Sequence, residues 1–120
     1  MEIVVFKEQH HVVIDTGASR SVFDKALLEK HMGNSLNEIE LQQASTLFGS
    51  SSALVGTIPE LQIGSLKIKN YETVALDLQS VSDTYLQLDQ PALAGIIGGD
   101  ILVQYQCQIN YLKKLIRFYH

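Results

Sequence analysis

The chain has 120 residues, a formal net charge of −4, 46% hydrophobic residues and 18% charged residues. This length suits a single domain over residues 1–120, and the composition excludes a disordered chain. The acidic balance and the presence of only two arginines argue against a nucleic-acid partner. No apolar run reaches the roughly 20 residues of a membrane span and no signal peptide opens the chain, so we expect no membrane partner and a cytoplasmic location.

The first part of the chain predicts a hairpin followed by a short helix. Residues 2–6 and 11–14 are rich in β-branched side chains and flank a polar segment, which is typical of two paired strands that run into Asp15. Residues 21–31 mix apolar and charged side chains as a short helix or irregular turn does, and Gly33 ends this element.

The middle of the chain predicts a second hairpin and further strands. A polar segment, residues 34–40, leads into a strand at 41–48, and a second strand at 53–58 follows a glycine and serine tip. Pro59 argues against a strand through its own position. Beyond it, apolar and polar side chains alternate with period two, which predicts strands at 61–64 and 66–69, and a further strand follows at 73–76.

The last part predicts a long loop, a short helix and a final hairpin. Polar residues and a proline predict the loop over 77–92, before a second apolar run broken by glycines. Residues 101–105 predict a short helix with Asp100 as its N-cap, and 107–110 pairs with 115–119. Most of these elements are short strands. The predicted class is therefore all-β with one or two short helices, packed as a closed barrel or a sandwich.

Two similar motifs stand in the two halves of the chain. An apolar run at 12–14 is followed by Asp-Thr-Gly at 15–17, and a second apolar run is followed by glycines at 98 and 99. A carboxylate directly after a buried strand, on a turn that glycine allows, is poorly solvated and surrounded by backbone donors, so it is chemically poised. Taken alone, Asp15 also fits an acid that merely bonds its own turn.

Four short segments complete one pattern: Asp15-Thr16-Gly17-Ala18-Ser19, Ile96-Ile97-Gly98, Asp100-Ile101-Leu102 and Ile109-Asn110-Tyr111. This pattern resembles the retropepsin-like aspartic proteases, the single-domain relatives of pepsin. The likeness covers nearly the whole chain in element order. It implies an acid-protease barrel with a flap hairpin and one or two short helices.

The resemblance implies an endopeptidase that hydrolyses extended polypeptides by water attack at a pair of aspartates. Two carboxyls about 3 Å apart share one proton, so that one activates the water while the other donates to the peptide carbonyl. This chain contains one Asp-Thr-Gly. In the second motif, Gly98 stands where an acid would be needed, or at best Asp100 two residues later. The implied enzyme is therefore a homodimer with one Asp15 per subunit, and it needs no metal or cofactor.

The resemblance also implies roles for the neighbours of Asp15. Thr16 would bond to the partner's loop across the dimer axis, and Gly17 would bring its backbone N–H to the carboxylates. Ala18 stands where pepsin-like enzymes carry a hydroxyl that bonds the acid, so we expect activity at mildly acidic or neutral pH.

Two further segments complete the implied site. The flap that closes over a bound peptide would contain Phe48, Gly49, Ser50 and Ser51. The second apolar-glycine loop would contain Ile96, Ile97 and Gly98. The chain departs from retroviral enzymes at Ser19 and Gly99, where those enzymes carry an acid and an arginine joined by an ion pair, so the dimer interface must be braced in another way.

Two rival functions remain open. The chain fits a catalytically silent retropepsin-like module used for dimerisation or for binding a peptide by strand addition, and it fits a monomeric domain that awaits a different partner chain. The intact Asp-Thr-Gly favours the enzyme, because a binding role has no need of that acid and hydroxyl together.

Other candidate site residues have simpler interpretations. His10 and His11 are adjacent on a predicted strand and so face opposite ways, which favours surface positions over a metal site. The glycines at 98 and 99 lack the lysine of a phosphate loop and predict a tight turn. The lone cysteine, Cys107, cannot form an internal disulfide, and we expect it to be a core residue.

Overall fold

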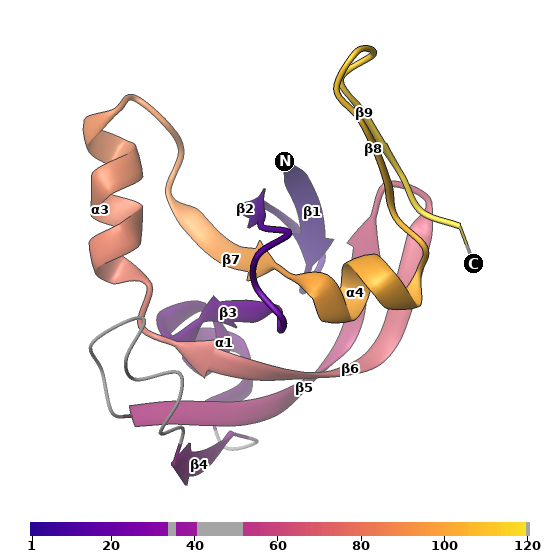
Figure 1. Cartoon of the computed structure of the whole chain (residues 1–120). Coiled ribbons are helices and arrows are strands. Elements are labelled where there is room, and N and C mark those ends of the chain that lie inside the picture. The colour runs from indigo at the N-terminus through magenta and orange to yellow at the C-terminus, as the bar shows by residue number, and fades with distance from the viewer. Residues whose placement is uncertain (34–35, 41–51, 120) are drawn as a thin grey trace.

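The computed structural model describes residues 1–33, 36–40 and 52–119, in which strands predominate (Figure 1). The strands are β1 (Glu2–Val5), β2 (Glu8–Ile14), β3 (Val22–Asp24), β4 (Asn37–Glu40), β5 (Ser52–Ile63), β6 (Leu66–Leu76), β7 (Leu93–Ile97), β8 (Gln108–Asn110) and β9 (Leu115–Arg117). The helices are α1 (Lys25–Met32), α3 (Gln79–Gln87) and α4 (Gly99–Gln104). None of these helices has the length and apolar character needed to cross a membrane.

Six strands form a closed barrel in the order β1-β2-β7-β3-β6-β5. The barrel closes because β1 also pairs with β5, with Val4 opposite Gln62 and Val5 opposite Leu61. β2 runs parallel to β7 and β3 runs parallel to β6, whereas the other pairs in the barrel are antiparallel. β4 extends the sheet beyond β5. The predicted all-β barrel with short helices is confirmed.

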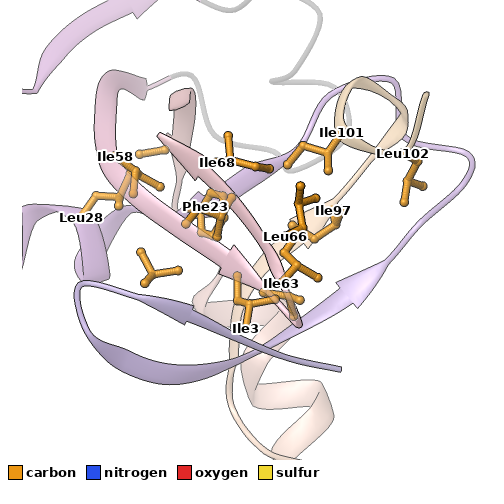
Figure 2. Close-up of a cluster of buried hydrophobic side chains, with 14 residues drawn as sticks. Ile3, Phe23, Leu28, Ile58, Ile63, Leu66, Ile68, Ile97, Ile101 and Leu102 are labelled. Carbon is orange, nitrogen blue, oxygen red and sulfur yellow. The ribbon is translucent and has the colours of Figure 1, made fainter. Parts of the chain in front are cut away.

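The barrel is filled by aliphatic side chains and one phenylalanine. Figure 2 shows this cluster, with Phe23 among side chains contributed by several strands and by α1 and α4. Along the first part of β6, Leu66 and Ile68 are buried and Lys67 and Lys69 are exposed, which confirms the predicted period of two. Each fully buried aliphatic side chain contributes roughly 1.5–3 kcal/mol to folding. These strands therefore provide a rigid support for the loops at their ends.

Several predicted elements are confirmed with small shifts. The first hairpin pairs β1 with β2, the helix α1 follows β3, and the last hairpin pairs β8 with β9. The predicted helix after Asp100 is present as α4, but it begins at Gly99 and its N-cap is Gly98. Asp100 lies inside the first turn, so its prediction as N-cap is wrong by two positions.

The strand prediction around Pro59 is wrong, because β5 continues through this residue. Proline is tolerated in a strand where its missing N–H is not needed by a neighbouring strand. The pairing of β4 with β5 ends at Val55 and that of β1 with β5 begins at Leu61, so β6 is the partner of β5 around Pro59. There the β6 residue Asn70 has a φ of 53°, which shows that the ladder is locally irregular.

The loop predicted over residues 77–92 contains the helix α3. Polar side chains cover most of this helix, which hides its periodicity in the sequence. The buried residue Ser82 attaches this helix to β7. Its Oγ accepts a hydrogen bond from the backbone N–H of Leu93 at 2.8 Å. The buried Leu78 precedes the helix and packs with Val74 and Leu76 of β6.

The polar segment at 37–40 was expected to lead into a strand and instead forms the strand β4, which pairs with β5 from Asn37 opposite Val55 to Glu40 opposite Ser52. The strand predicted at 41–48 and the tip predicted after it lie outside the described residues. The described part of the second hairpin is therefore the pairing of β4 with the first residues of β5.

Candidate active site

The position of Asp15 follows from two parallel strands. β2 and β7 lie side by side with Val13 opposite Ile96 and Ile14 opposite Ile97. Asp15 is the first residue after β2, and its backbone N–H donates to the carbonyl of Ile97 at 2.9 Å. The backbone of Asp15 is thus fixed by the strand ladder, while its side chain is exposed.

A tight turn follows Asp15. The N–H of Ala18 donates to the carbonyl of Asp15 at 3.2 Å, and the N–H of Gly17 donates to Asp15 Oδ1 at 2.9 Å. A Cβ atom on Gly17 would lie 3.3 Å from Asp15 Oδ1, so a larger residue would crowd this bond. Thr16, between them, is exposed. The turn therefore presents an acid, a hydroxyl and a backbone donor to the same surface region.

The second motif packs directly on this turn. Gly99 N–H donates to the carbonyl of Ala18 at 2.6 Å, and Asp100 N–H donates to the carbonyl of Ser19 at 3.1 Å. A Cβ atom on Gly98 would lie 2.7 Å from the carbonyl oxygen of Arg20 and 2.8 Å from that of Ala18. Only glycine permits so close an approach of two backbones. The two motifs lie about 80 residues apart in the sequence. Because they follow the paired strands β2 and β7, they lie side by side and form one structural unit.

Comparisons with known proteins identify a family whose match includes both of these motifs. A family model described as "Aspartyl protease" matches residues 2–101. The chain belongs to the aspartyl protease family. No curated protein gave a match to the sequence.

Two solved structures show the same fold as this aspartyl protease. One is the retroviral protease-like domain of Ddi1 from Leishmania major, with 15% identity, a TM-score of 0.63 and coverage of 98% of this chain and 84% of that chain. The other is a retropepsin-like aspartic protease from Rickettsia conorii, with 18% identity, a TM-score of 0.61 and coverage of 99% and 79%. These likenesses confirm the retropepsin-like fold. The family model over residues 2–101 confirms the suspected aspartyl protease family.

At this site of the aspartyl protease, sequence reasoning missed Ser21 and Tyr71 and their hydrogen bonds to Asp100. Asp100 accepts hydrogen bonds from the backbone N–H and the hydroxyl of Ser21 at 2.8 and 2.7 Å, and from the hydroxyl of Tyr71. Burial, and after it the bond to Asp100, raise the pKa of Tyr71 well above its ordinary value. Tyr71 therefore remains a donor at any physiological pH. The sequence marked Asp100 as a helix cap and as part of the motif that resembles retropepsin-like proteases, but no sequence pattern marks Ser21 or Tyr71 as its partner.

The structure places the other predicted site residues as follows. Ile97 and Gly98 are buried in the second loop of the aspartyl protease and Ile96 is half-buried, so these residues support the Asp15 turn. The predicted flap residues Phe48, Gly49, Ser50 and Ser51 lie outside the described residues. Their roles stay predictions.

Among the described residues of this aspartyl protease, Asp15 and Asp100 are the acids of the two loops, and their side chains differ in their bonding. The Asp15 side chain is exposed and accepts a hydrogen bond from Gly17 in its own turn, whereas Asp100 accepts hydrogen bonds from Ser21 and Tyr71. Gly98 occupies the place in the second motif that corresponds to the acid of the first. Aspartic protease chemistry uses two carboxyls, and the Asp-Thr-Gly motif places one such candidate, Asp15, in each copy of the chain.

The remaining candidates do not join this site. Over the described ranges, no group of three or more His, Cys, Asp or Glu residues has an arrangement suited to a metal ion. Cys107 is half-buried, packs against the core, and has its pKa raised by burial, which suits a packing role. His10 and His11 each lie near a glutamate on the strands β1 and β2, at 3.5 Å from Glu8 and 3.4 Å from Glu2.

Proposed function

We propose that this chain is an aspartic endopeptidase that acts as a homodimer, with one Asp15 from each copy forming the catalytic pair. The observation that carries this proposal is the exposed Asp15 carboxylate on a turn fastened by the second loop, in a member of the aspartyl protease family. A side chain fixed by its backbone and open at its carboxyl end can meet a symmetry-related copy at a two-fold axis.

In the proposed dimer the two carboxyls share one proton, because two like charges so close together cannot both ionise. The charged Asp15 takes a proton from water, whose oxygen attacks the peptide carbonyl carbon, while the protonated Asp15 donates its proton to the carbonyl oxygen. When the tetrahedral intermediate collapses, the nitrogen takes the proton held by one Asp15 and a hydroxyl of the intermediate returns its proton to the other Asp15. The C–N bond breaks, the amine and the carboxylic acid leave, and the pair again holds one proton. Neither a metal nor a covalent enzyme intermediate enters these steps.

The proposed substrate is an extended peptide with mostly apolar side chains. We propose that the flap that closes over it contains Phe48, Gly49, Ser50 and Ser51. Support comes from the antiparallel pairing of β4 with β5, which brings together the chain segments before and after these residues. A flap built on such a base could shield the reacting peptide from water.

Two features support contact between copies. Thr16 is exposed beside Asp15, so its hydroxyl is free to bond to a partner's loop. The β8–β9 hairpin projects from the barrel on the side away from α3 (Figure 1) and exposes the large apolar residues Tyr111, Leu112 and Leu115. Exposed apolar groups gathered on one element are typical of an interaction surface.

The proposal is tested by sedimentation of the purified protein together with cleavage of a peptide library. The wild type should sediment as a dimer and cleave peptides, and Asp15→Asn should abolish cleavage. Asp89→Asn is the matched control, because Asp89 is exposed and its φ of 59° suits asparagine. A monomer at high concentration, or cleavage that survives Asp15→Asn, contradicts the proposed mechanism.

A further inference from the structure

The carboxylate of Asp100 gathers hydrogen bonds from three separate elements. Its Oδ1 accepts from the backbone N–H of Ser21 at 2.8 Å, from the Ser21 hydroxyl at 2.7 Å and from the backbone N–H of Ile101 at 2.9 Å. Its Oδ2 accepts from the hydroxyl of Tyr71 on β6. Hydrogen bonds to an ionised acceptor are roughly twice as strong as neutral ones, so this carboxylate joins the end of the Asp15 loop, α4 and the barrel wall firmly.

Ser21 extends this set toward Asp15. Ser21 is buried, and while its hydroxyl donates to Asp100 it accepts a hydrogen bond from the N–H of Gly98 at 2.8 Å. The residue before Gly98 is Ile97, whose carbonyl accepts the N–H of Asp15. A continuous path of bonds therefore runs from Tyr71 through Asp100 and Ser21 to the backbone that holds Asp15.

We propose that Asp100 is a positioning residue for Asp15, and that Tyr71 and Ser21 act with it to fix how the Asp15 loop sits on the second loop. This inference rests on the proposed function. Asp100 does not touch substrate in this account. The Asp100 carboxylate accepts hydrogen bonds from donors on both loops. These bonds fix the position and orientation of the Asp15 turn relative to the second loop.

Such positioning matters because the proposed pair is built from two copies. A displacement of Asp15 in one copy is repeated in the other by symmetry. Both displacements therefore contribute to the change in the distance between the two carboxyls. Misplacement of reacting groups by about 1 Å can lower a rate about a hundredfold. The coupling that keeps one proton on the pair also weakens as the carboxyls move apart, which brings the two apparent pKa values of the pair closer together.

The test measures kcat and KM against pH for Asp100→Asn and Tyr71→Phe, with Asp89→Asn and Tyr85→Phe as matched controls. Asparagine keeps the shape of the side chain at residue 100 and removes its charge. We expect Asp100→Asn to lower kcat about tenfold or more with little change in KM. The pH range over which kcat is high should also become narrower, at both its acidic and its basic limits. Tyr71→Phe should produce a smaller change in the same direction, and neither control should move the profile.

A second measurement needs no substrate. The amide proton of Gly17, bonded to Asp15 Oδ1, reports the ionisation of Asp15 when its NMR shift is followed against pH. The two titration steps should lie closer together in Asp100→Asn and Tyr71→Phe than in the wild type. If Asp100→Asn does not fold, Tyr71→Phe carries the test through both readouts.

The outcomes separate the two proposals. A fall in kcat that leaves the pH profile and the Gly17 titration unmoved would show that Asp100 only stabilises the fold, and it would overturn the positioning role. The positioning role is also overturned if both variants behave as the wild type. Cleavage that survives Asp15→Asn, assayed in parallel, would instead overturn the proposed function.

Discussion

Asp15 and Asp100 lie on the two loops that form the site, and their surroundings differ sharply. Asp15 follows a strand, is exposed, and accepts a hydrogen bond from Gly17 in its own turn. Asp100 is half-buried and accepts hydrogen bonds from Ser21, Tyr71 and Ile101. A carboxylate whose acceptors are filled by fixed donors serves structure, whereas one left open can exchange a proton with a substrate water. The difference supports the proposal that the first acid is the catalytic one and that the second holds the loops in place.

The largest expected effect tests the open carboxylate. Asp15→Asn should lower kcat by about a thousandfold or more, because an amide cannot act as the base or share the proton. The free energy of unfolding should change by less than about 0.5 kcal/mol, because the side chain is exposed. Urea unfolding and a peptide-cleavage assay check the two halves of this prediction, and a large loss of stability would place Asp15 among the structural acids instead.

The contact between the two loops is tested by Gly98→Ala. The new Cβ would meet backbone oxygens of Arg20 and Ala18 at 2.7 and 2.8 Å, so the loops must separate. We expect a loss of about 1–3 kcal/mol in the free energy of unfolding together with a strong loss of cleavage. The control is Gly33→Ala, where a Cβ would meet nothing within 4 Å. Equal stability of the two variants would show that the loops can separate without cost.

The bonded carboxylate is tested by Tyr71→Phe, which removes one of its donors. We expect a loss of about 1.5 kcal/mol in the free energy of unfolding near neutral pH. Because burial and Asp100 raise the pKa of Tyr71 above its ordinary value of 10.0, the stabilisation is fully present below that pH and is lost as the pH rises further. The difference between wild type and variant in urea unfolding should therefore shrink at about pH 11. A constant difference at both pH values would contradict the assigned cause.

A feature of the fold or of the site could be predicted from the sequence when the residues that form it lie close together in the chain. The turn of Asp15 is local, and the strand patterns before both motifs predicted that they follow strands. The helix α3 was missed because its inner contact comes from Ser82, a polar residue that resembles a loop residue in sequence. The strand β4 was missed because its polar sequence carries no strand pattern, and its pairing with β5 supplies the order.

The role of Asp100 could not be predicted for a similar reason. Its partners come from residue 21 and residue 71, and no local pattern links three such distant positions. Only the closed barrel, which brings β3, β6 and the second loop together, places them within hydrogen-bond distance. The candidate acid and the glycine loop beside it were therefore visible in the sequence, and the hydrogen bonds of Ser21 and Tyr71 to Asp100 were not.

The smallest expected effect on folding concerns the surface through which two copies would meet. Leu112→Ser on the projecting β8–β9 hairpin should change the free energy of unfolding of one chain by less than about 0.5 kcal/mol, because Leu112 is 91% exposed. It should weaken dimer formation by about 1 kcal/mol if the hairpin lies in the interface. Leu86→Ser on α3, at a residue 51% exposed, is the control. Equal dimer dissociation constants for the two variants, measured by sedimentation, would place the interface elsewhere.

The most direct test of a site shared between two copies is a mixing experiment. A fixed amount of wild type is equilibrated with increasing amounts of Asp15→Asn, and cleavage is measured after subunit exchange. With equal amounts of the two chains, random pairing leaves about half of the wild-type chains in wild-type dimers, so activity should fall to about half and decline further as the variant is added. Activity that stays constant whatever amount of Asp15→Asn is present would contradict the claim that each active site needs an Asp15 from both copies.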